Sequence, residues 1–165
     1  MRWSKSVRRE WWPLVLRVIA GCGFMEHGFA KLSRGTDAFT DVLQALSVPL
    51  PHLMAWATIL TELFGGLAIL LGAFVWVVSI PLATVLLTAI VTVHLQYGFS
   101  SIKLMAVTPD GPQFGPPGYE TGLLYLGCLV VLVMAGTGPW SVDGVIARGS
   151  MDGGRSAPQS DREDI

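Results

Sequence analysis

Four stretches of the chain are dominated by apolar residues, and the segments between them are richer in polar residues, Gly and Pro. Each stretch has about 20 residues, which is the length that an α-helix needs to cross the hydrocarbon core of a bilayer. This pattern predicts an all-α fold built as a four-helix transmembrane bundle. The predicted spans cover residues 11–32, 53–71, 75–97 and 119–135.

A shorter amphipathic segment follows the first span. Apolar residues recur at helical spacing from Phe39 to Leu46, and Pro49 and Pro51 end the pattern. A helix of about 11 residues is too short to cross a bilayer. We therefore expect residues 36–46 to form a short interfacial or re-entrant helix between spans one and two.

Gly, Pro and charged residues define the other connections. Gly72 leaves room for only a tight turn, so the second and third spans must be antiparallel neighbours. Pro81 is expected to kink the third span, and residues 98–118 are predicted to be irregular because they are rich in Gly and Pro. The membrane domain is predicted to cover residues 1–148, and a disordered cytoplasmic tail residues 149–165.

Composition supports a lipid environment. Hydrophobic residues make up 52% of the chain and charged residues only 14%, whereas soluble proteins have about 25% charged residues. No Asp, Glu, Lys or Arg occurs between Glu62 and Lys103, or between Glu120 and Asp143. The net charge of −1 gives no support for nucleic-acid binding. The bilayer is therefore the first predicted partner.

The basic residues predict the orientation of the bundle. Four Lys or Arg residues lie in the N-terminal tail, three in the C-terminal tail and three in the connections. By the positive-inside rule both termini are expected to face the cytoplasm, and four spans make the chain a multi-pass membrane protein. The first apolar run is too long for a cleaved signal peptide, so we expect a retained helix. Arg17, near its cytoplasmic end, is expected to snorkel to the interface.

Ionisable side chains inside the predicted spans share one depth. Such groups are costly in a bilayer and are candidates for function. All four spans place at least one of them in the outer half. The candidates are Glu26, His27, Lys31, Glu62, His94 and Glu120. His27 and Lys31 share one helical stripe, whereas Glu26 points about 100° away from His27.

Several short motifs occur in a characteristic order along the chain. They are Arg17, EHGFAKL at residues 26–32, ELFGGL at 62–67, HLQYGF at 94–99, Glu120 and GTGPWSVD at 136–143. In these motifs the chain resembles the DoxX (DoxD-like) family of small bacterial membrane proteins. The resemblance implies a four-helix membrane bundle and an association with redox chemistry. Some relatives are subunits of a thiosulfate:quinone oxidoreductase, and others are linked to sulfur or oxidative-stress enzymes.

These observations favour a membrane subunit that supports a redox reaction. It would bind a quinone, or another small apolar ligand, in an outer-half pocket made by His27, Glu62, His94 and Glu120. Glu62 would exchange the proton, as the catalytic residue, while His27 and His94 would hydrogen-bond the ligand. Glu120, Glu26 and Lys31 are further ligand-binding candidates. The chain lacks a dinucleotide-binding fingerprint, so a soluble or membrane redox partner would supply the electrons. On this interpretation it is a subunit of a quinone-linked oxidoreductase.

Other interpretations remain open. Two His and two Glu could hold a metal, or the His pair a haem, although the metal-binding spacing His-x-x-x-His is missing. Each His could instead pair with a carboxylate and stabilise the bundle, and Glu62 could be a neutral carboxyl bonded to His94 or a backbone carbonyl. Cys22 and Cys128 could form a redox pair, although buried thiols are more often inert. The alternative function is a non-catalytic scaffold or assembly factor for a redox complex.

Overall fold

The protein is described by a computed structural model that covers residues 11–138 and 140–153, with side chains up to residue 147. The described chain is mostly helical, as the hydropathy pattern predicted. Its helices are α1 (Trp12–Ser33), α2 (Thr36–Ala45), α3 (Pro51–Leu71), α4 (Val75–Ala89), α5 (Glu120–Ala135) and α6 (Val142–Gly153). A π-helical turn, η2 (Ile90–His94), and a 3₁₀ turn, η3 (Leu95–Tyr97), continue α4. The strands β1 (Leu104–Thr108) and β2 (Gly111–Phe114) form a hairpin.

Two of these helices are long and apolar enough to cross a membrane. They are α3 and the continuous helix Val75–Tyr97, which comprises α4, η2 and η3. The apolar helix α5 has 16 residues and is shorter. The helix α1 has 22 residues and is continuous, but its apolar sequence contains the charged residues Arg17, Glu26 and Lys31. The bounds of all four helices agree with the predicted spans to within two residues at each end.

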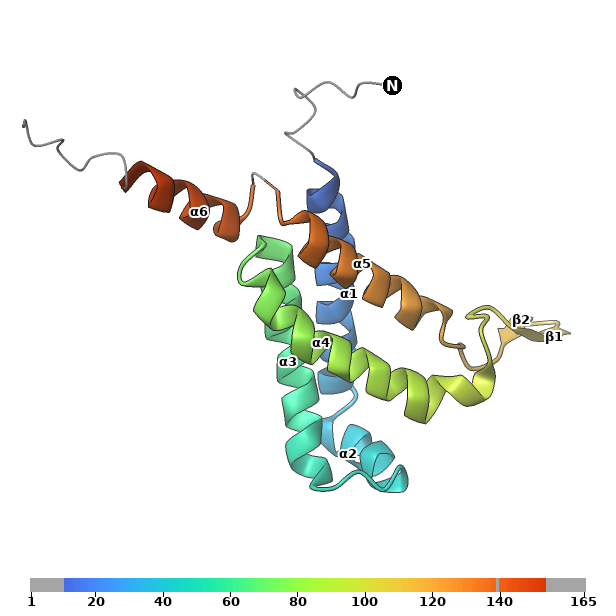
Figure 1. Cartoon of the computed structure of the whole chain (residues 1–165). Helices are drawn as coiled ribbons and strands as arrows, with labels where there is room; N and C mark the ends of the chain where they lie inside the picture. The colour runs from blue at the N-terminus through green and yellow to red at the C-terminus, as the bar shows by residue number, and fades with distance from the viewer. Residues whose placement is uncertain (1–10, 139, 154–165) are drawn as a thin grey trace, which may run out of the picture.

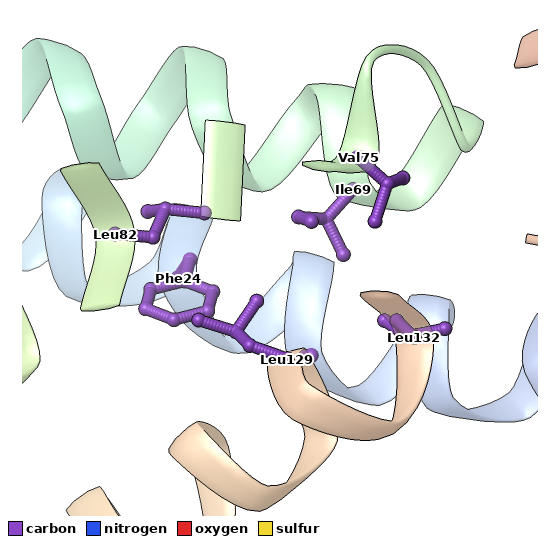
Figure 2. Packing of buried hydrophobic residues seen from close by; sticks show 7 residues of the cluster. Phe24, Ile69, Val75, Leu82, Leu129 and Leu132 are labelled. Atoms are coloured by element: carbon purple, nitrogen blue, oxygen red, sulfur yellow. The ribbon is translucent and has the colours of Figure 1, made fainter. Parts of the chain in front are cut away.

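The helices form two pairs that meet at one end (Figure 1). In one pair α1 and α3 lie side by side, with α2 against them; in the other, α4 and α5 run obliquely away towards the hairpin. The core lies where the two pairs meet, at the end of the bundle that carries the α3–α4 turn. Buried apolar side chains from α1, α3, α4 and α5 interlock there (Figure 2). They are Ala20, Phe24, Ile69, Val75, Leu82, Leu129 and Leu132.

Glycines allow α1 and α3 to approach closely. A Cβ atom added to Gly21 would lie 2.8 Å from the Gly66 carbonyl oxygen, and one added to Gly66 would lie 2.8 Å from the Gly21 carbonyl oxygen. Such close backbone contact is typical of membrane helices, which pack through small residues. Gly65 faces Leu82 of α4 instead, so adjacent glycines of α3 admit two different neighbours.

The segment at residues 98–118 is not irregular throughout, and that prediction was wrong. β1 and β2 pair in antiparallel register, with Thr108 opposite Gly111 at the turn. The sequence does contain a turn signal, because Pro109-Asp110-Gly111 combines a residue with fixed φ, a residue that caps turns and a glycine. Gly111 adopts the positive φ of 119° that favours glycine.

Two further expectations concern the helices. α4 continues through Pro81, so the kink expected there stays a prediction, and the helical winding changes later, at the π-helical turn η2. α6 extends to Gly153 and so crosses the predicted start of the disordered tail at residue 149. The rest of that predicted tail, residues 154–165, lies outside the described residues.

Candidate functional site

Glu62 is a buried carboxylate in the middle of α3, with 5% of its surface exposed. Its partner is Lys31 near the end of α1, whose Nζ donates a hydrogen bond to Glu62 Oε1 at 2.6 Å and also contacts Oε2. No other salt bridge joins side chains in the part of the chain that the structure describes. Buried charges are stable in an apolar setting only when they are paired, so this ion pair accounts for Glu62 at this depth.

The packing of α1 on α3 positions this pair. A Cβ atom added to Gly28 would lie 3.2 Å from Glu62 Cβ and 2.9 Å from Leu63 Cγ, so the helices touch at this level. Lys31 follows Gly28 by about one helical turn, and long side chains on a helix lean back towards its N-terminus. The ammonium group also lies 5.3 Å from the ring centroid of Phe39 in α2. Lys31 therefore links three helices.

His27 lies one turn before Lys31 on α1 and is exposed. Its ring packs edge-on against Tyr125 of α5, with 5.8 Å between the ring centroids. Tyr125 makes a second such contact with Phe24, at 5.2 Å. The Tyr125 hydroxyl occupies the space beside Gly23, where any side chain would collide with it. An imidazole, a phenol and the Lys31–Glu62 pair thus lie along one side of α1; we call these four residues the candidate site.

His94 and Glu120 lie elsewhere, at the ends of the helices that carry the hairpin. His94 Nδ1 lies 3.0 Å from the carbonyl oxygen of Pro117. Glu120 Oε2 accepts a hydrogen bond from the backbone N–H of Ser101 at 3.0 Å. Both side chains therefore attach the connection at residues 98–118 to the helix ends. Among the described residues, neither side chain forms a hydrogen bond or an ion pair with Glu62.

Glu26 occupies a third environment. It is exposed on the side of α1 that faces away from α3, and it has no hydrogen-bond or ion-pair partner among the described residues. The structure thus pairs Lys31 with Glu62 and places His27 one turn before Lys31 on α1. The other three predicted ligand-binding residues have different surroundings. The pairing of Glu62 with Lys31 was not foreseen, because residues 31 positions apart do not reveal their register in the sequence.

Arg17 of α1 is a buried arginine. The expectation that it snorkels to an interface was wrong, because only 3% of its surface is exposed. Its guanidinium donates hydrogen bonds of 2.8–3.3 Å to backbone carbonyls. The acceptors are the carbonyl oxygens of Ile69, Leu70, Thr137 and Trp140. A lone arginine within an apolar run was the available signal, but the carbonyls become visible only in the fold.

Asp143 completes the same end of the bundle. Its carboxylate accepts hydrogen bonds from the backbone N–H groups of Phe74, at 2.7 Å, and Val75, at 3.2 Å. Free N–H groups at a helix start need such acceptors, and the carboxylate also suits the positive end of the helix dipole. Asp143 therefore attaches the start of α6 to the start of α4.

The described residues contain no group of three or more His, Cys, Asp or Glu side chains arranged to hold a metal ion. Cys22 is exposed on α1 and Cys128 is half-buried on α5, and both are free thiols. The candidate site can instead offer a carboxylate that exchanges a proton, a cation that stabilises negative charge, and hydrogen-bonding groups from His27 and Tyr125.

Comparison with known proteins agrees with the resemblance seen in the motifs. The model of the DoxX family matches residues 12–95, which include Lys31 and Glu62 but end before Glu120. A Bacillus subtilis (strain 168) protein named "Putative oxidoreductase CatD" is 36% identical over 88 residues, which are 52% of this chain. The matched part spans 62% of that relative. No solved structure matches the chain.

Proposed function

The chain belongs to the DoxX family of membrane proteins, and from this premise we propose that it is a membrane subunit supporting a redox reaction. We assign the four spans to α1, α3, the continuous helix Val75–Tyr97 and α5, with α2 in the interface. Both termini would face the cytoplasm and the membrane would be the bacterial inner membrane. Large apolar side chains on the outer surface support this placement, because lipid would solvate them. Examples are Phe64, Trp76, Val91 and Leu124, each more than 60% exposed.

The ligand we propose is a quinone or another small apolar molecule that enters from the lipid. A quinone supplies two-electron redox chemistry and presents carbonyl oxygens that accept hydrogen bonds. The side chains fit such a group, because His27 is exposed on α1 and is packed against the phenol ring of Tyr125. His27 would hydrogen-bond the ligand, and its contact with Tyr125 would orient the imidazole.

Glu62 carries this proposal. A buried carboxylate held by a single lysine can take up or release a proton at Oε1 or Oε2 while Lys31 shifts, because the lysine side chain is flexible and 24% exposed. Reduction of a quinone to the quinol takes two electrons and two protons. The catalytic role of Glu62 would be to pass these protons one at a time to the ligand oxygens, with water restoring the proton on the carboxyl group after each transfer; oxidation would run in reverse. Electrons would come from a soluble or membrane redox partner protein. His94, Glu120 and Glu26 contact other surroundings, so we place the ligand next to His27, Lys31 and Glu62.

A second function is favoured by a specific observation. The Lys31–Glu62 pair, with Phe39 close by, joins α1, α2 and α3, so the same residues could serve only to hold the helices together. The chain would then be a non-catalytic scaffold or assembly factor for a redox complex. The two proposals differ in what they predict for ligand binding.

Quinone binding to the purified full-length chain separates them. Mass spectrometry would measure co-purified quinone, and titration with a short-chain ubiquinone or menaquinone analogue would give the dissociation constant. His27→Ala should weaken binding about tenfold, the loss expected for one buried hydrogen bond. His94→Ala is the matched control and should leave binding unchanged, since that ring contacts Pro117.

Glu62→Gln tests the proton role separately. This variant should retain quinone binding, but the partner should reduce the quinone much more slowly, because the side chain that relays the two protons is lost. If the unmodified chain binds no quinone, and His27→Ala or Glu62→Gln alters only the recovery of partner proteins, the scaffold function is correct.

A further inference from the structure

One face of α1 is exposed along its whole length. Its residues recur at alternating steps of four and three, the spacing of a coiled-coil seam. They are Val15, Ile19, Cys22, Glu26, Phe29 and Ser33, which we call the outer stripe. At about 100° per residue, the outer stripe lies opposite the buried face that contains Arg17, Phe24 and Gly28. Neither α3 nor α5 can therefore cover it.

The outer stripe has the chemistry of a helix contact and not of a surface that faces only lipid. Val15, Ile19 and Phe29 are each more than half exposed and could face acyl chains. A Glu26 side chain that faced acyl chains would be unfavourable in free energy. It lies about 10 Å along the axis from the end of α1, so it is inside the membrane if α1 spans as proposed. Its carboxyl group needs a hydrogen-bonding partner that the described residues do not provide.

A second copy of the chain provides a partner of the right kind. A protonated carboxyl group donates one hydrogen bond and accepts others, so two Glu26 side chains related by a two-fold axis can satisfy each other. A single polar residue in an otherwise apolar seam also fixes the register of two helices. A different helix would need its own donor at the same depth, whereas the two-fold arrangement needs only residues that this chain has.

We propose that the chain forms a two-fold symmetric dimer through the outer stripe of α1, with the two Glu26 carboxyl groups paired in the membrane. In such a parallel pair, Ile19, Glu26 and Ser33 occupy one set of seam positions, and Val15, Cys22 and Phe29 occupy the other. The Cys22 side chains of the two copies then lie opposite each other. The dimer depends on the proposed membrane placement of α1 and is independent of quinone binding.

Oxidative crosslinking of the full-length chain in native membranes tests the seam. Copper phenanthroline should convert it to a reducible species of twice the mass. Cys22→Ser should abolish this species, whereas Cys128→Ser should leave it unchanged, because Cys128 lies on α5. In a chain without native cysteines, Phe29→Cys should restore the crosslink. Leu32→Cys is the matched control: Leu32 is exposed on the same helix but about 100° from the stripe, so it should not crosslink.

Measuring the dimer dissociation constant in liposomes tests the carboxyl pair. Labelled copies of the chain are diluted with lipid, and energy transfer between them reports the dimer. Glu26→Ala should raise the dissociation constant about tenfold. Glu26→Gln should keep most of the affinity, because two amides can also bond to each other, and Leu32→Ala should have no effect.

Three results would overturn the dimer: no crosslink from either Cys22 or Phe29→Cys, a Cys22 crosslink to a protein of different mass, or a dimer that is insensitive to Glu26→Ala. Extraction of the membranes with carbonate separates this failure from failure of the proposed function. A chain that stays in the membrane and binds quinone but gives none of the expected crosslinks would refute the dimer alone.

Discussion

Arg17 and Glu62 are both buried charged residues at the contact of α1 with α3, yet they are held in different ways. Arg17 donates hydrogen bonds to four backbone carbonyls from the end of α3 and from the segment after α5. Glu62 has the ammonium group of Lys31 as its partner, at the end of a long and partly exposed side chain. Backbone carbonyls of packed segments hold a fixed position, whereas a lysine can move. The Arg17 end is therefore suited to stabilising the fold. The Glu62 level can accommodate the movement that the proposed proton transfer requires.

The contacts of the α1 glycines with α3 also differ between the Arg17 end and the level of Glu62. Near Arg17, α1 and α3 touch backbone to backbone at Gly21 and Gly66. At the level of Glu62, a Cβ atom added to Gly28 would lie 2.9 Å from Leu63 Cγ and 3.2 Å from the Ile59 carbonyl oxygen, so the backbones are slightly farther apart. The helix pair is therefore tightest at the end where it joins α4, α5 and α6, and it has more freedom where the candidate site lies.

Loss of Arg17 should produce the largest effect on stability. Arg17→Ala removes the guanidinium donor from four carbonyls, of which the Ile69 carbonyl also accepts from the backbone N–H of Gly72. We expect a loss of about 3 kcal/mol or more in the free energy of unfolding. Unfolding of the purified chain in mixed micelles with rising SDS would measure it. Arg17→Lys should recover only part of the loss, because an ammonium cannot reach all four carbonyls. An Arg17→Ala chain as stable as the original would contradict the view that this end stabilises the fold.

The glycine substitutions should give the next largest effect and should differ from each other. Gly21→Ala places a methyl group 2.8 Å from a backbone oxygen, and we expect a cost of about 2–3 kcal/mol. Gly28→Ala should cost less, about 1 kcal/mol, because the nearest backbone atom, the Ile59 carbonyl oxygen, would lie 3.2 Å from the added carbon. Gly127→Ala has no atom within 4 Å of the added carbon and should stabilise α5 slightly. If Gly21→Ala and Gly28→Ala lowered the free energy of unfolding equally, the helices would be packed equally tightly near Arg17 and near Glu62, and the comparison would fail.

The ion pair should have the smallest effect on stability. A double-mutant cycle with Lys31→Met and Glu62→Gln should give a coupling of about 1 kcal/mol, within the range of polar pairs between membrane helices. The same cycle with Lys31→Met and Glu120→Gln should be additive, because Glu120 contacts Ser101 instead. A Lys31–Glu62 coupling as large as the loss from Arg17→Ala would indicate a structural pair and would favour the scaffold function.

The positions of the helices could be predicted from the sequence because they depend on local information. Hydropathy over about 20 residues, together with Pro51 and Gly72, was enough to place α3 to within two residues of its observed bounds. The same information was present for the hairpin in Pro109-Asp110-Gly111, although the abundance of Gly and Pro suggested an irregular segment. The candidate residues were predicted from depth alone, since ionisable groups in apolar runs are few, but depth could not separate His94, Glu120 and Glu26 from the Lys31–Glu62 pair.

The sequence by itself therefore determined that this is a helical chain with apolar spans, and which side chains are costly inside them. Only the tertiary structure decided the partners of those side chains: Lys31 for Glu62, Tyr125 for His27 and four carbonyls for Arg17. The physical reason is that these contacts depend on the rotation and axial register of one helix against another. That register is set by packing at glycines such as Gly21 and Gly66, and helices that agree in depth can still diverge, as α4 and α5 do from α1 and α3.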